Sequence, residues 1–285
     1  MSLPLPSTLS PSKMAAFKEC ALAFRLGAID KLPEPPSPAA TRGSLVHRAL
    51  QELFWSHPAG ARTVAASEAA LEVAWAQLQL DPEFAALELA EDQARAFRAE
   101  AASLLRRYFA IEDPNQVRAI GVELLLEANL GDLRLRGIID RLDLDADGEL
   151  VVTDYKTGRV PPTGYEQRRL GGVHFYAYLC ERVLGRRPAR VQLLYLSEPL
   201  VISTVPSEQS VRGLERQARA IWSAVRLACE REDFRPRPSP LCASCGFHAY
   251  CPAMGGDVAL VPRPAVPMAG AGAGTGTGSG AGTPR

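Results

Sequence analysis

Two acidic residues and a lysine lie on two neighbouring apolar segments and could together form a cation site. Asp140 belongs to Gly137-Ile-Ile-Asp140-Arg, and Asp154 and Lys156 belong to Val151-Val-Thr-Asp154-Tyr-Lys156-Thr-Gly158. Hard divalent cations such as Mg²⁺ prefer carboxylate oxygens as ligands. Two carboxylates that face each other repel, and a cation between them would turn that cost into binding. The alternative is an edge hairpin with solvated charges.

A β-hairpin is the element that would bring these side chains together. Both segments are apolar and β-branched, and the turn-forming residues Asp145 to Gly148 lie between them. A three-residue loop with Gly148 in the left-handed conformation places Asp140 opposite Asp154. Lys156 shares a face with Asp154, because side chains two apart on a strand point the same way. The same register pairs apolar residues, Leu144 with Leu150 and Leu142 with Val152.

The composition is that of an ordinary globular protein. The 285 residues are 47% hydrophobic and 22% charged, which allows one large domain or two small ones with a sizeable core. Lys+Arg and Asp+Glu are both 32, so an anionic partner must be bound by a local patch or through a metal. No apolar run is long enough to span a bilayer and no signal peptide is evident, so we expect a cytoplasmic protein without a membrane partner.

Two helices are expected before the acidic segments. The first runs from about Lys13 to Gly27 and carries Cys20, and the second runs from Thr41 to Trp55. In the second, His47 lies on the apolar side, because Leu50 and Phe54 follow it at helical spacing. His47 is therefore either a packed core histidine or an imidazole ligand of the carboxylate site.

The remaining pattern predicts an α/β fold. Residues 60–111 indicate two helices within an insertion of about 58–115, interrupted at Asp81-Pro82. A strand over 119–127 contains Glu123, which we expect at the surface, although it could face the same cleft as Asp140. The order strand, strand, strand, helix, strand, helix predicts a mixed central sheet flanked by helices. The last three elements are expected over 165–184, 189–196 and 207–232.

Cysteines form the second signal. Cys242, Cys245 and Cys251 lie within ten residues near prolines and a glycine, a pattern that packing does not explain. Cys20 is the best candidate for a fourth thiolate, since Cys180 and Cys229 lie in helical runs and resemble small buried apolar residues. Zinc and an iron–sulfur cluster both accept four thiolates, so spacing does not choose between them. Either would tie the first helix to segment 234–256.

These motifs together resemble the PD-(D/E)xK nuclease superfamily, and in particular its RecB-like exonuclease branch with a four-cysteine cluster. That branch includes AddB-like nucleases and the CRISPR-adaptation nucleases. The resemblance covers about residues 7–256 and rests on Gly43-x-x-x-His47, Gly137-x-x-Asp140-Arg141 and Asp154-x-Lys156-Thr-Gly158, together with the early and late cysteines. It implies a restriction-endonuclease-like core over 13–256, after an extension of 1–12. The Gly- and Ala-rich residues 257–285 would form a disordered tail.

The resemblance also implies a site. His47, Asp140, Asp154 and the main-chain carbonyl of Tyr155 would bind Mg²⁺ or Mn²⁺, and Asp140, Asp154 and Lys156 would be catalytic. The four cysteines, Cys20, Cys242, Cys245 and Cys251, would hold a [4Fe–4S] cluster, with zinc as the alternative. Contacts to substrate phosphates are expected from Arg141, Arg168 and Arg169, with Tyr176 also at the substrate.

The expected function is metal-dependent hydrolysis of DNA, by an exonuclease of repair or recombination. One departure bears on it: relatives usually carry a glutamine four residues before the tyrosine of the following helix, where this chain has Gly172. Gln167 or His174 could supply a substitute. The alternative function is a catalytically weak DNA-end-binding module. No G-x-x-x-x-G-K-[ST] motif is present, so unwinding would come from a helicase partner.

Overall fold

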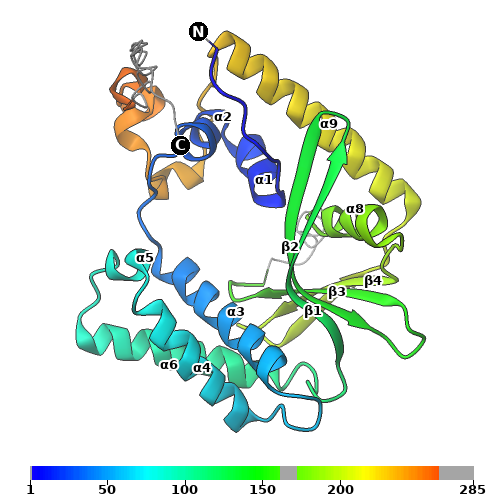
Figure 1. Ribbon diagram of the computed structural model, residues 1–285. Coiled ribbons are helices and arrows are strands. Elements are labelled where there is room, and N and C mark those ends of the chain that lie inside the picture. The colour runs from blue at the N-terminus through cyan, green and yellow to red at the C-terminus, as the bar shows by residue number, and fades with distance from the viewer. Residues whose placement is uncertain (1, 161–171, 263–285) are drawn as a thin grey trace, which may run out of the picture.

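A five-stranded sheet forms the centre of the computed structural model, which describes residues 2–160 and 172–262 (Figure 1). Its strands lie in sequence order, and only β3 and β4 run parallel, so the predicted mixed sheet is confirmed. The strands are β1 Arg118–Leu130, β2 Leu133–Leu144, β3 Leu150–Lys156, β4 Arg190–Tyr195 and β5 Leu200–Thr204.

The hairpin of β2 and β3 has the predicted register. Leu142 pairs with Val152 and Leu144 with Leu150. Gly148 closes the turn with φ +77°, a conformation that costs glycine little because it has no Cβ. The register brings Asp140 and Asp154 to the same end of the hairpin, one residue beyond its last paired positions.

Helices cover both faces of the sheet. One lobe packs its own apolar core against Tyr155, Leu194 and Leu196. The other face holds a larger core that includes Leu142, Val152 and residues of the N-terminal helices. The lobe consists of α3 Pro38–Ser56, α4 Val64–Leu78, α5 Pro82–Ala85 and α6 Glu91–Tyr108, and the larger core contains α8 Val173–Leu184 and α9 Glu208–Arg231.

Three elements differ from the sequence-based prediction. The short helix α5 is a third helix in the segment 60–111, where two were expected. The single first helix is instead divided into α1 Pro11–Glu19, α2 Ala21–Phe24 and a π-helical turn Arg25–Ile29. The break falls at Cys20, whose backbone is extended with φ −157° and ψ 113°. Strand β5 was not predicted, because its side chains alternate irregularly between exposed and half-buried at the sheet edge.

The two ends of the described chain lie side by side (Figure 1). Helix α2 is next to a C-terminal segment of short 3₁₀ turns, and the amide of Arg237 lies 3.4 Å from the Cys20 sulfur. None of the helices in the described ranges is long and apolar enough to cross a membrane. The 3₁₀ turns are Pro240–Ser244, His248–Tyr250, Pro252–Met254 and Val258–Leu260.

Candidate functional site

Helix α3 and strands β2 and β3 meet at His47, Asp140 and Tyr155. The amide of Tyr155 donates a hydrogen bond of 2.7 Å to Asp140 Oδ2. His47 Nε2 lies 3.1 Å from the Tyr155 carbonyl oxygen, and His47 Nδ1 lies 3.5 Å from Asp140 Oδ2. The structure therefore brings together three of the residues expected at a metal site, and His47 faces the carboxylates rather than only the apolar core.

Asp154 and Lys156 form an ion pair beside this group. Asp154 is 6% exposed, and its Oδ2 atom contacts the Lys156 ammonium. Burial raises the pKa of Asp154 to about 6, an effect that the charge of Lys156 opposes and that of Asp140 reinforces. Lys156 itself remains 40% exposed and can reach a substrate.

Charge at the site also acts on His47. Burial alone would lower the pKa of this imidazole, but its hydrogen bond to Asp140 and the charges of Asp140, Asp154 and Glu123 outweigh burial and raise the pKa. If Nε2–H donates to the Tyr155 carbonyl, the Nδ1 lone pair faces carboxylates. That arrangement is favourable only when a proton or a cation lies between them.

Glu123 is a member of the site that the sequence reading placed at the surface. Its carboxylate, that of Asp140 and a nitrogen of His47 lie within 4.8 Å of one another. Glu123 lies on β1 between the pairs Val122–Arg141 and Leu124–Ile139, which puts it level with Asp140. Its φ of +47° is unusual for a residue with a side chain, and such strain concentrates at functional sites.

This donor set fits a hard divalent cation. It offers an imidazole, two carboxylates within reach of one another, and a third, buried carboxylate that is paired with Lys156. Oxygen ligands with at most one imidazole suit Mg²⁺ and Mn²⁺ better than soft metals. The residues that could hold such an ion are His47, Glu123, Asp140 and Asp154, with the carbonyl of Tyr155 adjacent.

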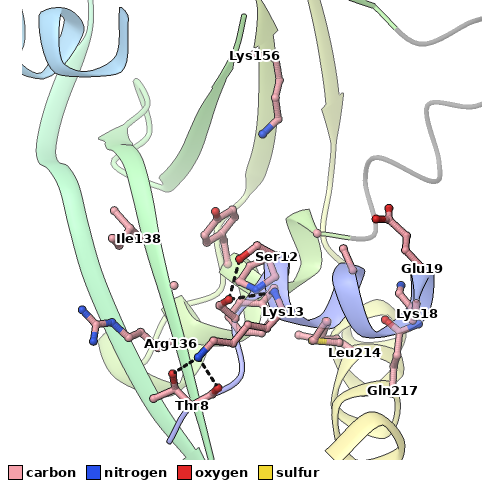
Figure 2. A pocket seen from close by; sticks show the side chains of 18 of the residues that line it. Thr8, Ser12, Lys13, Lys18, Glu19, Arg136, Ile138, Lys156, Leu214 and Gln217 are labelled. Atoms are coloured by element: carbon pink, nitrogen blue, oxygen red, sulfur yellow. Dashed lines mark hydrogen bonds between the residues drawn. The ribbon is translucent and has the colours of Figure 1, made fainter. Parts of the chain in front are cut away.

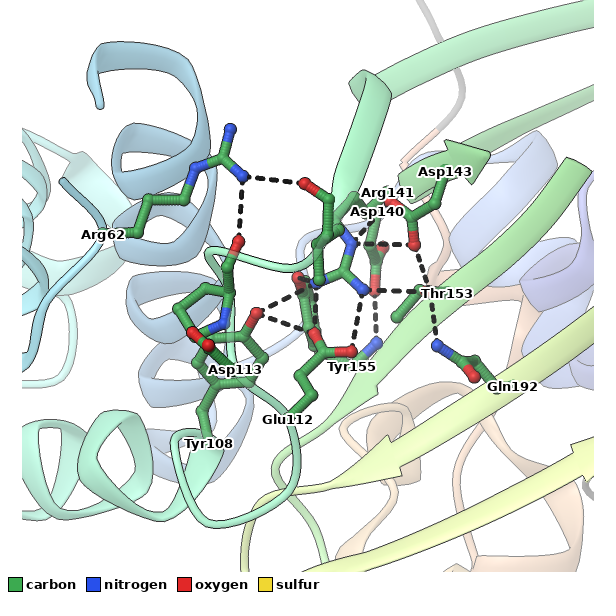
Figure 3. A network of polar contacts seen from close by, with 12 residues as sticks. Arg62, Tyr108, Glu112, Asp113, Asp140, Arg141, Asp143, Thr153, Tyr155 and Gln192 are labelled. Carbon is green, nitrogen blue, oxygen red and sulfur yellow. Dashed lines mark hydrogen bonds and ion pairs between the residues drawn. The ribbon is translucent and has the colours of Figure 1, made fainter. Parts of the chain in front are cut away.

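Arg141 is not available to a phosphate, contrary to the sequence-based expectation. Its side chain is buried, and its guanidinium pairs with Asp143 at 2.8 Å and with both carboxylate oxygens of Glu112 (Figure 3). It also donates to the hydroxyls of Tyr108 and Tyr155, at 3.0 and 2.7 Å. Arg141 thus fixes the Tyr155 hydroxyl by a hydrogen bond and links the sheet to Tyr108 of helix α6.

The other expected substrate contacts divide into two groups. Arg168 and Arg169 lie outside the described residues. Tyr176 of α8 is half-buried near the acidic group: burial raises the pKa of its hydroxyl strongly, and the charges of Asp154 and Asp140 reinforce this. Helix α8 packs closely on β2 because Gly137 has no side chain, since a Cβ there would lie 2.9 Å from Leu179.

The four cysteines expected to share a ligand line one cavity of about 240 Å³. Cys20 comes from the break between α1 and α2, and the other three come from the C-terminal 3₁₀ turns. Each is half-buried, whereas Cys180 and Cys229 are buried in the main core as predicted. The cavity lining includes Cys20, Cys242, Cys245 and Cys251.

Comparison with known proteins shows which family this chain is similar to. The sequence model of the PD-(D/E)XK nuclease superfamily matches residues 8–252. None of the curated proteins matches the chain in sequence. A crystal structure of a candidate exonuclease from Eubacterium rectale is similar, with a TM-score of 0.51 and 12% identity over 84% of this chain and 87% of that one. The crystal structure of SSO0001 aligns with a TM-score of 0.37 and 17% identity over 75% and 85%.

Proposed function

The chain belongs to the PD-(D/E)XK nuclease superfamily, and from this premise we propose that it is a DNA nuclease that hydrolyses phosphodiester bonds with Mg²⁺ or Mn²⁺. We place it with the RecB-like exonucleases that act in DNA repair or recombination. One observation carries the proposal: His47, Glu123 and Asp140 converge within 4.8 Å, next to the Asp154–Lys156 pair. Hard cation ligands and a partly exposed ammonium are groups that support phosphodiester hydrolysis.

The residues of the site have distinct roles in this proposal. A divalent cation bound there would lower the pKa of water and neutralise phosphoryl oxygens. His47, Asp140 and Asp154 would hold the cation, and Glu123 would add a fourth ligand. Lys156 reaches the scissile phosphate from the exposed side of Asp154, where its positive charge offsets the negative charge that builds up during hydrolysis. This electrostatic role does not require Lys156 to lose its proton.

A cleavage assay on labelled DNA tests the proposal. We expect the wild type to cut in Mg²⁺ or Mn²⁺ and to stop in EDTA, and we expect Asp154→Asn and Lys156→Ala to lose at least about a hundredfold in rate. Both variants should melt within a few degrees of the wild type. Cleavage at wild-type rates by either variant would refute the site assignment.

The cysteine cavity supports a site with four thiolate ligands, because Cys20, Cys242, Cys245 and Cys251 line it together. Zinc and an iron–sulfur cluster both accept four thiolates. By the same resemblance we propose a [4Fe–4S] cluster, which would fasten the end of α1 to the C-terminal turns.

A second function is favoured by one residue. Gly172 is exposed at the position where the resembling nucleases usually carry a glutamine, so this position supplies no side chain. A DNA-end-binding module with weak catalysis, working beside a helicase, would tolerate this loss. In the cleavage assay such a module would bind labelled DNA ends in EDTA but cut them only slowly in Mg²⁺ or Mn²⁺.

A further inference from the structure

A groove of about 1250 Å³ opens beside the proposed metal site. Tyr176 and Gly172 are among its lining residues. Lys156 lies at one end of it, and Thr8 and Lys13 lie at the other (Figure 2). Its walls come from α1, β2, α8 and the segment around Ser239. The groove is therefore continuous with Lys156, the residue proposed to contact the scissile phosphate.

Positive charge gathers in this groove although the whole chain has a formal net charge of zero. Among the described lining residues, the single carboxylate is Glu19. A local excess of cations in a concave surface attracts an anion and raises its local concentration. The five cationic lining residues are Lys13, Lys18, Arg136, Lys156 and Arg237.

Lys13 is a groove cation whose ammonium is held by uncharged oxygens of the chain. Its ammonium is held by the carbonyl and hydroxyl oxygens of Thr8, at 3.1 and 3.3 Å, which leaves one of its three protons free. In the part of the chain that the structure describes, it has no acidic partner. Arg136, which lines the same groove, forms an ion pair with Glu127 at 3.6 Å. Half-burial and the positive charge of Arg136 both lower the pKa of Lys13. Lys13 and Arg136 therefore repel each other unless an anion binds between them.

The groove also has an apolar side. Ile138 and Leu241 are exposed there, and Tyr176 presents an aromatic ring next to Gly137. Cations that follow a backbone, together with aromatic and apolar surface for bases, are typical of sites for single strands. In a duplex the bases are stacked inside and could not use this surface.

We propose that the groove binds single-stranded nucleic acid, with Lys13 and Arg136 gripping a phosphate removed from the scissile one. The inference rests on the proposed nuclease function and names the form of its substrate. The strand enters between α1 and β2 and leads to Lys156. Lys13 and Arg136 bind substrate and take no part in the chemical step.

Binding without cleavage tests this inference. Fluorescence anisotropy of a labelled oligothymidylate in EDTA gives the affinity and its dependence on salt. We expect Lys13→Gln and Arg136→Gln each to weaken binding by roughly three- to tenfold, as for lost charged hydrogen bonds at a partly exposed site. Each should reduce the slope of log K against log salt by about 0.7, the value for one phosphate of a single strand. Lys13→Arg should restore both quantities.

Arg134→Gln is the matched control. Arg134 lies two residues from Arg136 on the same exposed face of β2 and also pairs with Glu127, but it does not line the groove. It should bind like the wild type. Unchanged affinity and salt slope in Lys13→Gln and Arg136→Gln would overturn the inference. So would substitutions that weaken the binding of a hairpin duplex as much as they weaken the binding of the single strand. A wild type that binds in this way but never cuts would count against the nuclease proposal alone.

Discussion

Gly43 lies so close to Thr157 that a Cβ at position 43 would approach Thr157 Oγ1 to 2.9 Å. The backbone of helix α3 at Gly43 therefore packs directly against the Thr157 side chain, just beyond the end of β3. One helical turn later, His47 reaches the carbonyl of Tyr155 at 3.1 Å. The glycine in the Gly43-x-x-x-His47 motif thus determines whether the imidazole reaches the acidic residues.

Replacing Gly43 with valine should push α3 away from β3. We expect affinity for Mn²⁺ to fall at least about tenfold and stability to fall by about 1–3 kcal/mol, the usual cost of overpacking. Titration calorimetry and thermal unfolding measure the two effects. The control is Gly213→Ala in α9, where a Cβ would meet nothing within 4 Å. It should gain up to about 1 kcal/mol in stability from helix propensity and bind Mn²⁺ as before.

Metal affinity should rise with pH. Burial raises the pKa of Asp154 to about 6, and the acidic neighbours raise the pKa of His47 despite its burial. A proton on either group must leave before the ion binds, so lowering the pH through these pKa values costs about tenfold in affinity per unit for each proton displaced. Calorimetry with Mn²⁺ over roughly pH 5 to 8 checks this. An affinity that is flat over that range would contradict the proton coupling.

Removing the buried arginine should strongly lower the stability of the fold. Arg141→Ala leaves Glu112 and Asp143 without their guanidinium, and an uncompensated buried charge costs about 3–5 kcal/mol. Urea unfolding measures the loss. The comparison is Arg95→Ala, which breaks an exposed pair with Glu91 on α6 and should change stability by no more than about 0.5 kcal/mol. If Arg141→Ala lost no more free energy of unfolding than Arg95→Ala, the contacts of Arg141 with Glu112 and Asp143 would not be stabilising.

The cysteine cavity predicts a coloured protein. Anaerobic preparations should be brown, with an absorbance band at about 400 nm, and should contain bound iron and sulfide. Cys20→Ala should lose the colour and the iron, because it removes one of the four thiols that line the cavity. Cys229→Ala, at a buried cysteine outside the cavity, should keep both. A colourless wild type with bound zinc would exclude the cluster.

The hairpin was predictable because two constraints agree there. Side-chain alternation and the turn at Gly148 both lead to the pairing of Leu142 with Val152, and a shift by one residue would expose the apolar face. Where only one constraint acts, the prediction failed. Helical periodicity continues through Cys20, yet the backbone there is extended and turns the thiol towards the C-terminal segment.

The candidate site shows the same limit. Glu123 and Arg141 could not be placed from local pattern, because their positions depend on which elements lie over them. A change of register between Ala119 and Gly121 sets Glu123 level with Asp140. The side chain of Arg141 is covered by Tyr108 and Glu112, which come from the helical lobe and its exit rather than from the sheet. Only a tertiary fold reveals either contact.

Helix α1 is shared by two parts of the molecule. Its first turn carries Lys13 in the groove, and its end leads into Cys20 in the cysteine cavity. Arg237 and Glu19 line both spaces. Oxidative loss of the proposed cluster would therefore loosen the α1 wall of the groove, while α3 and the sheet still support His47 and Asp140. The damaged protein would keep its proposed metal site and bind single-stranded nucleic acid more weakly.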